Sequence, residues 1–431
     1  MITIAADWIR VRWPELVARG SLLIPLSQWD DGDAFTLAEL GPLPGPVRVI
    51  GCVVLRGAAD RDAPVVVSLS RHEGPPGTHT FAAADGHTYA ATAQRLEGES
   101  TRPLDVQIVE VTAALAERRT ALLESTLLID AHVGIIGLGT GGAHVALELA
   151  KAGVGHFALV DDQRLEVGNV ARHHAGISLV GRRKVYVARD LILEKNPAAQ
   201  VEAYAIEASL ETKALLRTII QRVDVLVCAV DDRPSKLFIN RLAVEFGKVA
   251  IYGGAFRRAY GGQVLHVRPG RSPCYQCFVM AMPEEASDEE IASETDAARI
   301  AYTDRPVPVE PGLSLDVAPL ALMVARLALH GLVASRSATS RVLERDLSAP
   351  WYLWVNRPEP GTPYATWPPL SESSDDMTIL RWYGISFDRD PACPVCGDFV
   401  GAMLTAHGLK DQNEQYLPEL PPGVSIPREH D

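Results

Sequence analysis

The sequence predicts an α/β protein built on a Rossmann-like, doubly wound and mostly parallel sheet, with a small mixed α/β domain before it. Three observations support this prediction. Apolar β-like segments alternate with segments of helical apolar spacing between residues 132 and 254. A glycine-rich turn joins the first of these strands to its helix. The first 110 residues instead combine many Pro and Gly residues with short β-like runs.

The composition is that of a globular protein large enough for two or three domains. The 431 residues are 47% hydrophobic and 22% charged. Asp and Glu number 54 against 41 Lys and Arg, and the formal net charge of −13 disfavours nucleic acid as the main partner. The start of the chain lacks the apolar run of a signal peptide. The apolar stretch 318–333, interrupted by Pro319 and Arg326, is short of the roughly 20 residues of a membrane span. We therefore expect a cytoplasmic protein with no nucleic-acid or membrane partner.

Residues 1–110 are expected to form the small accessory domain. Its β-like segments lie at 47–55, 64–70 and 78–93. Within the last segment, the Asp85-Gly86 pair predicts a hairpin turn, because glycine accepts the positive φ angles that such turns require.

Residues 111–410 are expected to form the sheet domain. Helical apolar spacing at 111–128 leads into a strand, a glycine turn, a helix and a second strand that ends near Asp161. The alternation then predicts helices at 185–195, 209–222 and 234–246, strands near 201–208, 223–232 and 249–254, and a hairpin through 258–270. The acidic stretch 283–306 is expected to be a long crossover loop, and residues 411–431 an extended or disordered tail.

A glycine turn marks a nucleotide site. Gly137, Gly139 and Gly142 form a Gly-x-Gly-x-x-Gly pattern between a strand and a helix, where glycines let phosphate oxygens approach the N–H groups at the helix start. Asp161, at the end of the next strand, is placed to bond ribose hydroxyls. These two features alone are compatible with NAD, FAD or ATP.

A polar cluster further along the chain favours ATP. Asn169, Arg172 and Lys184 lie in one segment that can fold over the glycine turn. A nicotinamide cofactor is bound intact and does not need such a cluster, whereas an enzyme that breaks a triphosphate must neutralise charge on its phosphates. Asp231 follows the next apolar strand at the carboxyl edge of the sheet, where a carboxylate is a natural ligand for Mg²⁺.

Four of the six cysteines form two Cys-x-x-Cys pairs, Cys274/Cys277 and Cys393/Cys396. Together the pairs fit a structural Zn²⁺ site with four thiolate ligands. A redox or disulfide pair is the alternative, although neither pair has the strand-to-helix context of a thioredoxin-like motif. The other two cysteines, Cys52 and Cys228, lie in apolar strands and are expected to be core residues.

These motifs, in this order, resemble the ThiF/MoeB family of ubiquitin-activating-type enzymes, which adenylate the C-terminal carboxylate of a ubiquitin-like protein. The resemblance covers about residues 110–400 and implies a ThiF-type adenylation domain. It implies that Gly139 and its neighbours hold the phosphates of ATP, that Asp161 holds the ribose, and that Asp231 binds Mg²⁺ and supports attack on the α-phosphorus. The residues that it assigns to the triphosphate are Asn169, Arg172 and Lys184. Many family members carry two Cys-x-x-Cys pairs in these relative places, which supports zinc.

The chain departs from the family pattern at three places. Gln163 stands where the family has a second Asp, but the ribose role falls on the first, so activity is expected to survive. The family also supplies an arginine from before the glycine turn, usually from the dimer partner, and the candidates Arg118 and Arg119 have a shorter spacing. Members that form their own thioester keep a cysteine in the crossover loop, whereas residues 278–316 contain none. Cys52 is the only thioester candidate outside the sheet domain and the zinc pairs.

The expected activity is therefore ATP- and Mg²⁺-dependent adenylation of the C-terminal glycine carboxylate of a ubiquitin-like protein. The acyl-adenylate is expected to pass to a partner thiol, in a sulfur-carrier pathway or in a conjugation pathway such as bacterial antiviral conjugation. The expected partners are the carrier, a conjugating-enzyme-like protein and a second copy of the chain in a homodimer. Two alternatives stay open. An NAD-dependent oxidoreductase would share the glycine turn, and an inactive scaffold half of an activating-enzyme complex would share the fold.

Overall fold

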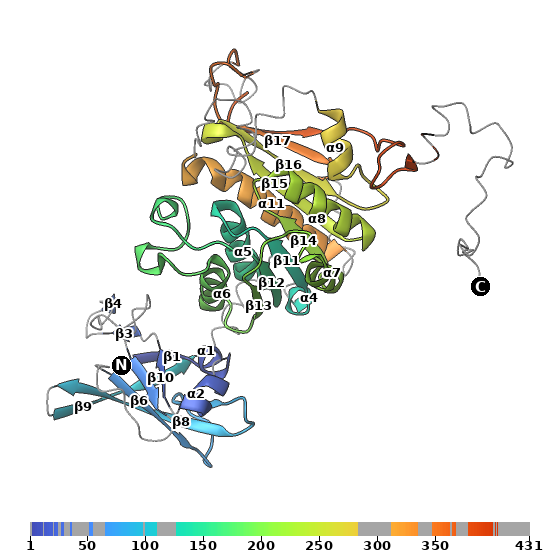
Figure 1. Cartoon of the computed structure of the whole chain (residues 1–431). Coiled ribbons are helices and arrows are strands. Elements are labelled where there is room, and N and C mark those ends of the chain that lie inside the picture. The colour runs from blue at the N-terminus through green and yellow to red at the C-terminus, as the bar shows by residue number, and fades with distance from the viewer. Residues whose placement is uncertain are drawn as a thin grey trace, which may run out of the picture.

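A computed structural model gives the arrangement of the helices and strands (Figure 1). The residues that the structure describes are 2–11, 13–19, 21–24, 27–29, 35–36, 51–54, 65–97, 100–109, 126–282, 312–334, 347–362, 364–367, 378–399, 401 and 403. The expected helix at 111–128 is described only from residue 126. The expected crossover loop at 283–306 and the expected tail at 411–431 lie outside the described residues.

The N-terminal part is a small mixed α/β unit with two sheets. One has the strand order β10-β1-β3-β4, and the other has the order β2-β5-β6-β8-β7 with β9 paired to β8. The strands are β1 (Ile2–Ala5), β2 (Ser21–Ile24), β3 (Ser27–Trp29), β4 (Phe35–Thr36), β5 (Gly51–Val54), β6 (Val65–Arg71), β7 (Thr80–Ala82), β8 (Thr88–Glu97), β9 (Ser100–Leu104) and β10 (Val106–Val109). Helices α1 (Ala6–Val11) and α2 (Trp13–Arg19) bury Ile9 and Trp13 in its core. The predicted hairpin is confirmed, because β7 and β8 pair antiparallel and Gly86 between them has φ +78°.

The second part is an eight-stranded sheet with the order β13-β12-β11-β14-β15-β16-β17-β18. Its strands are β11 (His132–Ile136), β12 (His156–Val160), β13 (Gln200–Tyr204), β14 (Val225–Cys228), β15 (Val249–Ala255), β16 (Gly261–Val267), β17 (Trp351–Val355) and β18 (Arg381–Ile385). The first five strands in this order run parallel, and each of the last three runs antiparallel to its neighbour. The predicted Rossmann-like sheet is therefore present, with β17 and β18 as additions that the sequence pattern does not predict.

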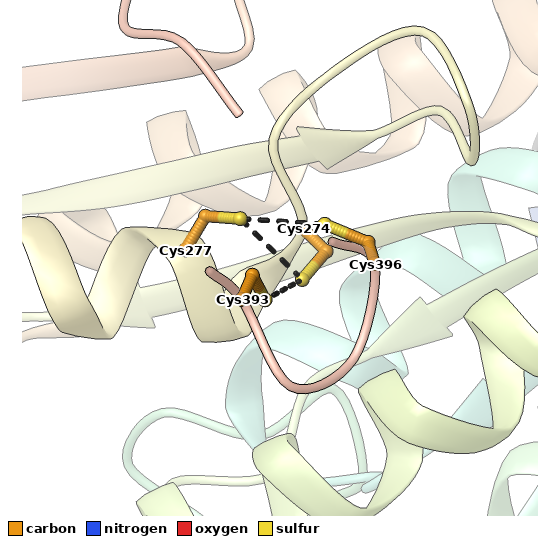
Figure 2. A group of neighbouring side chains, drawn as sticks. All are labelled: Cys274, Cys277, Cys393 and Cys396. Atoms are coloured by element: carbon orange, nitrogen blue, oxygen red, sulfur yellow. Dashed lines mark hydrogen bonds between the residues drawn. The ribbon is translucent and has the colours of Figure 1, made fainter. Parts of the chain in front are cut away.

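One face of this sheet carries α7 (Lys213–Arg222), α8 (Arg233–Glu245) and α9 (Tyr275–Ala281). The helices bury apolar side chains such as Ile239 against Leu226 of the sheet. The first cysteine pair lies at the start of α9, and the second pair approaches it from the C-terminal segment (Figure 2).

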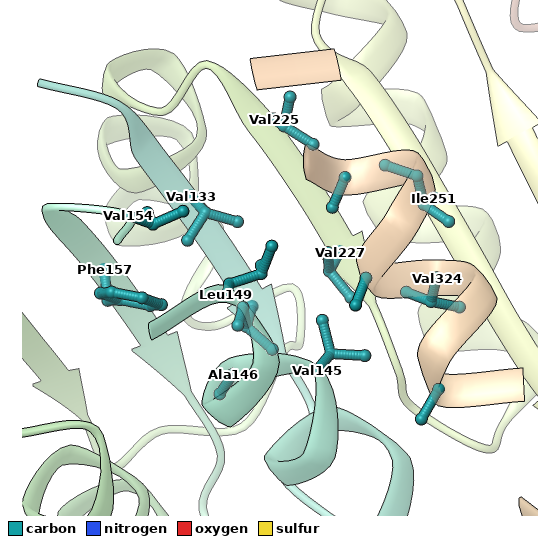
Figure 3. Close-up of a cluster of buried hydrophobic side chains, with 14 of the residues drawn as sticks. Val133, Val145, Ala146, Leu149, Val154, Phe157, Val225, Val227, Ile251 and Val324 are labelled. Atoms are coloured by element: carbon teal, nitrogen blue, oxygen red, sulfur yellow. The ribbon is translucent and has the colours of Figure 1, made fainter. Parts of the chain in front are cut away.

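The other face carries α5 (Thr140–Ala152), α6 (Lys184–Lys195) and α11 (Ser314–Ala334), so the sheet is covered by helices on both sides. A short helix, α4 (Thr126–Ile129), leads into β11. Figure 3 shows Val324 of α11 beside Val227 and Ile251 of the sheet, with Leu149 of α5 in the same apolar layer. Helices and strands thus share one continuous core, which holds the strand ends in place.

The helix α11 corrects one expectation. The apolar stretch was expected to be too short for a membrane span, but α11 runs for 21 residues with Pro319 inside it. By length and composition it is long and apolar enough to cross a membrane, and it alone passes that test among the described residues. Half of the most apolar stretch of α11 is buried, and the helix packs against α5, β14, β15 and β16. A core helix held between a sheet and a second helix accounts for this apolar composition.

Candidate nucleotide and metal sites

The turn between β11 and α5 requires glycine at two positions. Gly137 has φ +89°, and a Cβ there would lie 2.7 Å from the carbonyl carbon of Ala229. A Cβ on Gly142 would lie 1.9 Å from the carbonyl oxygen of Gly137. Around Gly139, by contrast, no described atom beyond its two chain neighbours lies within 4 Å of the Cβ position. The turn is therefore closed on its sheet side and open at Gly139, where the first N–H groups of α5 can bind an anion such as a phosphate.

Asp161 lies just beyond β12 and is bonded to this turn. Its Oδ2 accepts a hydrogen bond from Leu138 N at 2.7 Å, and its Oδ1 accepts one from Gln163 N at 2.8 Å. Burial raises the pKa of Asp161, while the charge of Lys184 and the two backbone N–H groups act to lower it. The carboxyl group is thereby fixed at the edge where the parallel strands β11 and β12 end side by side.

His173 joins this site, although none of the motifs indicates it. The side chain is 8% exposed, its Nδ1 accepts from Ala175 N at 3.0 Å, and its Nε2 lies 3.1 Å from Leu138 O. Because Nδ1 accepts, Nε2 carries the proton and donates to the Leu138 carbonyl. Burial lowers the pKa of His173, which favours this neutral form. The segment after β12 is thus fastened to the glycine turn, and the signal in the sequence is only the adjacent pair His173 and His174.

Lys184 begins α6 and is 7% exposed. Its Nζ donates to Gln163 Oε1 at 2.6 Å, and its backbone N donates to Gln163 O at 2.9 Å. Gln163, at the position where the chain departs from the family pattern, is therefore the hydrogen-bond partner that holds the lysine. The ammonium group is close enough to Asp161 to lower its pKa, so the site combines a buried cation with a fixed carboxyl group.

Asn169 and Arg172 lie in the segment between Gln163 and Lys184. Asn169 ends a short helical turn, and its Oδ1 accepts from Glu166 N at 3.1 Å. Arg172 is half-buried, and its backbone N donates to Asn169 O at 3.0 Å. Among the described residues, no carboxylate forms an ion pair with the Arg172 guanidinium. Its charge is therefore available to a bound anion.

Asp231 lies at the end of the neighbouring strand. After β14 ends at Cys228, Ala229 packs against the glycine turn, with its Cβ 3.2 Å from the Cβ position of Gly142. Asp231 follows two residues later and is exposed, and Asp232 caps α8 by accepting from Ser235 N at 2.7 Å. A carboxylate at this edge of the sheet is a suitable ligand for a hydrated cation.

The predicted site residues therefore fall into two groups, which differ in whether they lie at the glycine turn. Those at the edge of the glycine turn are Asp161, Lys184 and Asp231, together with His173. The described hydrogen bonds of Asn169 and Arg172 stay within their own segment and do not reach the turn. The arginine candidates Arg118 and Arg119 lie outside the described residues.

The two cysteine pairs form one cluster (Figure 2). The Sγ–Sγ distances are 3.9 Å for Cys274 and Cys277, 3.7 Å for Cys274 and Cys393, and 3.3 Å for Cys277 and Cys396. All four sulfurs lie within 4.8 Å of one another, and all four residues are free cysteines. Two thiolates on a tetrahedral zinc ion with bonds of about 2.3 Å lie about 3.8 Å apart, so this cluster fits such an ion.

Hydrogen bonds within the cluster favour a thiolate at one position. The hydrogen bond from Cys274 lowers the pKa of Cys277, while the same bond and burial raise the pKa of Cys274. The thiolate is the form that binds metals. Of the other cysteines, Cys228 is fully buried in β14, which confirms its expected place in the core. Cys52 lies in β5, and its side chain is outside the described part of the chain.

The sequence also matches a known family. A sequence model of the ThiF family matches residues 119–353, more than half of the chain. The chain belongs to the ThiF family. The range that matches the ThiF family includes the glycine turn, Asp231 and the first cysteine pair, and it ends within β17.

The ThiF-family chain is similar to curated proteins over part of their length. Adenylyltransferase and sulfurtransferase MOCS3 of Sus scrofa is 32% identical over 206 residues, which cover 45% of this chain and 44% of that protein. Ubiquitin-like modifier-activating enzyme 5 of Caenorhabditis elegans is 24% identical over 206 residues, which cover 46% and 48%. Sulfur carrier protein adenylyltransferase of Thermus thermophilus is 32% identical over 161 residues, which cover 36% and 57%. The chain spans about half the length of the curated relatives it matches.

Proposed function

We propose that this ThiF-family chain uses ATP and Mg²⁺ to adenylate the C-terminal glycine carboxylate of a ubiquitin-like or sulfur-carrier protein. The observation that carries the proposal is the hydrogen bond from the glycine turn to Asp161, with Lys184 close enough to affect the same carboxyl group. A carboxylate for the ribose, a helix start for phosphates and a cation are thereby held at one sheet edge. The names of the three relatives, which include adenylyltransferases and a modifier-activating enzyme, support the same reaction class.

Each group has a role in this proposal. The N–H groups at the start of α5 hold the phosphates, and Asp161 accepts hydrogen bonds from the ribose hydroxyls. Lys184 neutralises phosphate charge, and Arg172 and Asn169 complete the phosphate site. Asp231 holds Mg²⁺, which supplies further positive charge beside the phosphates when it is bound. The residues therefore act by positioning ATP and by stabilising the charge that moves to pyrophosphate.

The reaction follows from these positions. A carboxylate oxygen of the carrier's last glycine attacks the α-phosphorus, the bond from this phosphorus to the bridging oxygen breaks, and pyrophosphate leaves. Residues 278–316 contain no cysteine and Cys228 is fully buried, so the acyl-adenylate is proposed to pass to a thiol or amine of another protein. That acceptor is a conjugating-enzyme-like protein in one class of pathway and a sulfur donor in the other.

The same proposal includes a structural zinc ion, a homodimer and a reducing, cytoplasmic compartment. The clustered free thiols support both the zinc and the compartment. A zinc ion closed by four thiolates has no open position, so it takes no part in the transfer. Leu315 and Leu322 are exposed on α11 and offer an apolar surface to a second copy of the chain.

Pyrophosphate exchange tests the proposed reaction. With labelled pyrophosphate and a candidate carrier that ends in glycine, label is expected to enter ATP only when the carrier is present. Lys184→Met and Asp231→Asn are each expected to lower exchange by about 100-fold or more, because each removes charge stabilisation at the phosphates. Lys195→Met changes an exposed lysine at the other end of α6 and serves as the matched control.

The outcomes separate the alternatives. Undiminished exchange in Asp231→Asn would overturn the assignment of the site. ATP binding with no exchange for any carrier favours an inactive scaffold half of an activating-enzyme complex. Nicotinamide binding without pyrophosphate chemistry favours an oxidoreductase.

A further inference from the structure

Asn240 is a fully buried polar residue of α8 that contacts the start of the first cysteine pair. Its side chain is 0% exposed, and its Oδ1 accepts a hydrogen bond from Tyr275 N at 3.0 Å. Tyr275 follows Cys274 directly and is the first residue of α9. Asn240 therefore fixes the peptide that connects the cysteine to its helix.

The other end of the same amide is unsatisfied. Asn240 Nδ2 is buried and has no hydrogen-bond partner among the described atoms. A buried donor without an acceptor destabilises the folded chain, so an acceptor is expected nearby. The candidate acceptor is the sulfur of Cys274, because Tyr275, whose N–H is bonded to the other end of this amide, follows Cys274 directly. A metal-bound thiolate carries negative charge and accepts hydrogen bonds from N–H groups, so it suits this donor.

We infer that Asn240 is a positioning residue of the cysteine metal site, which donates from Nδ2 to Cys274 Sγ when the four thiolates hold a metal ion. Its two hydrogen bonds, to Tyr275 N and to Cys274 Sγ, then fix both the backbone and the sulfur of one metal ligand. Such partners of metal ligands orient them, and their loss lowers metal affinity by about 10–100-fold.

The packing of α8 on α9 supports this role. Lys236 lies one turn before Asn240, is 1% exposed, and its Nζ lies 6.0 Å from the centre of the Tyr275 ring. The same helix begins after Asp231 and is capped by Asp232. One rigid helix therefore contacts the first cysteine pair with its middle and reaches the edge of the glycine turn with its start.

Cobalt binding to the full chain, stripped of metal, tests the inference. Cobalt(II) bound to thiolates gives a charge-transfer absorption band, which reports both affinity and the environment of the sulfurs. Asn240→Asp keeps an oxygen for Tyr275 N but loses the donor, and it is expected to bind cobalt about 10–100-fold more weakly with a shifted band. Asn196→Asp is the matched control, because Asn196 is also buried, and its Nδ2 donates to Val154 O at 2.9 Å. This control is expected to keep the affinity and the band.

A second measurement needs no substitution. In the cadmium-113 form of the unaltered chain, a hydrogen bond from Asn240 Nδ2 to a metal-bound sulfur is expected to give a scalar coupling between the amide proton and the metal. If Asn240→Asp does not fold, this coupling alone tests whether Asn240 donates to the metal-bound sulfur. Wild-type cobalt affinity in a folded Asn240→Asp chain, or no coupling from the Asn240 amide, overturns the inference.

Discussion

His266 is a buried histidine in β16 whose two ring nitrogens have no hydrogen-bond partner in the described part of the chain. Burial lowers its pKa from 6.5 to about 3, and Arg268 and His330 act in the same direction. The folded protein therefore keeps His266 neutral at pH values where the unfolded chain binds a proton. The residue links the stability of the fold to pH.

We expect acid to destabilise the fold through His266. Its folded-state pKa lies below its unfolded value of 6.5, so its contribution is fully present above about pH 6.5 and is lost as the pH falls toward 3. The loss is at most about 1.4 kcal/mol per pH unit, or about 2 kcal/mol at pH 5. Urea unfolding at pH 7 and pH 5 measures it. Between these pH values, the free energy of unfolding of His266→Leu is expected to fall by about 2 kcal/mol less than that of the wild-type chain. An equal fall in both chains would contradict the prediction.

At the scale of the element, the glycine turn excludes a side chain at Gly142 and leaves room at the preceding residue. Gly142→Ala places a Cβ against the Gly137 carbonyl oxygen, so the backbone must shift, and we expect a loss of about 1–3 kcal/mol in stability together with a loss of ATP binding. Gly141→Ala is the control, because no described atom beyond its chain neighbours and its own helix backbone lies within 4 Å of its Cβ position, and alanine favours a helix by up to about 1 kcal/mol. Thermal unfolding and ATP titration measure both variants. Equal melting temperatures of Gly142→Ala and Gly141→Ala would argue against a close approach between the Gly142 Cβ position and the Gly137 carbonyl oxygen.

Elements that depend on local pattern were predictable from the sequence, and those that depend on distant pairing were not. The helix predicted at 185–195 runs from Lys184 to Lys195, because its apolar spacing is local. The helix predicted at 209–222 begins only at Lys213, since Thr212 Oγ1 bonds Glu207 O in a turn before it. The pairing of β16 with β17 joins segments far apart in the chain, and no local pattern reports it.

The residues of the candidate site also divide into those that a local pattern indicates and those that depend on distant contacts. Gly137 and Gly142 were predictable because the turn admits only glycine there, and Asp161 because it follows a strand end. His173 was not predictable, because its role rests on a contact with Leu138, 35 residues away. The hydrogen bond from Lys184 to Gln163 depends on the folded loop, and a lysine in such a loop is also compatible with a solvated surface.

At the scale of the whole molecule, the cysteine cluster joins segments that are 119 residues apart. A cross-link that closes a loop of about 100 residues stabilises a fold by about 4–5 kcal/mol in the chain-entropy model. A bound metal ion is expected to act similarly, because the loop it closes contains α11 and the strand β17 of the large sheet.

Removal of the metal is therefore expected to lower the melting temperature by about 10 °C or more. Thermal unfolding with and without a strong chelator measures this effect. Cys393→Ser is expected to melt at the lower temperature with no further response to the chelator. Cys228→Ala removes a buried cysteine outside the cluster and is expected to keep the response. A wild-type melting temperature that the chelator leaves unchanged would exclude a stabilising metal.

The position of the cysteines also sets an order of events during synthesis of the chain. The parallel strands and the glycine turn are all contained in residues 132–255, whereas the cluster needs Cys396. At about 5–20 residues per second, the ribosome takes on the order of ten seconds to pass from one point to the other. The parallel strands and the glycine turn are therefore synthesised before the metal site can close, and in this interval Cys274 and Cys277 lack the two cysteines of the second pair. Oxidants and competing metals have their best access to the protein in this interval, before the second pair arrives.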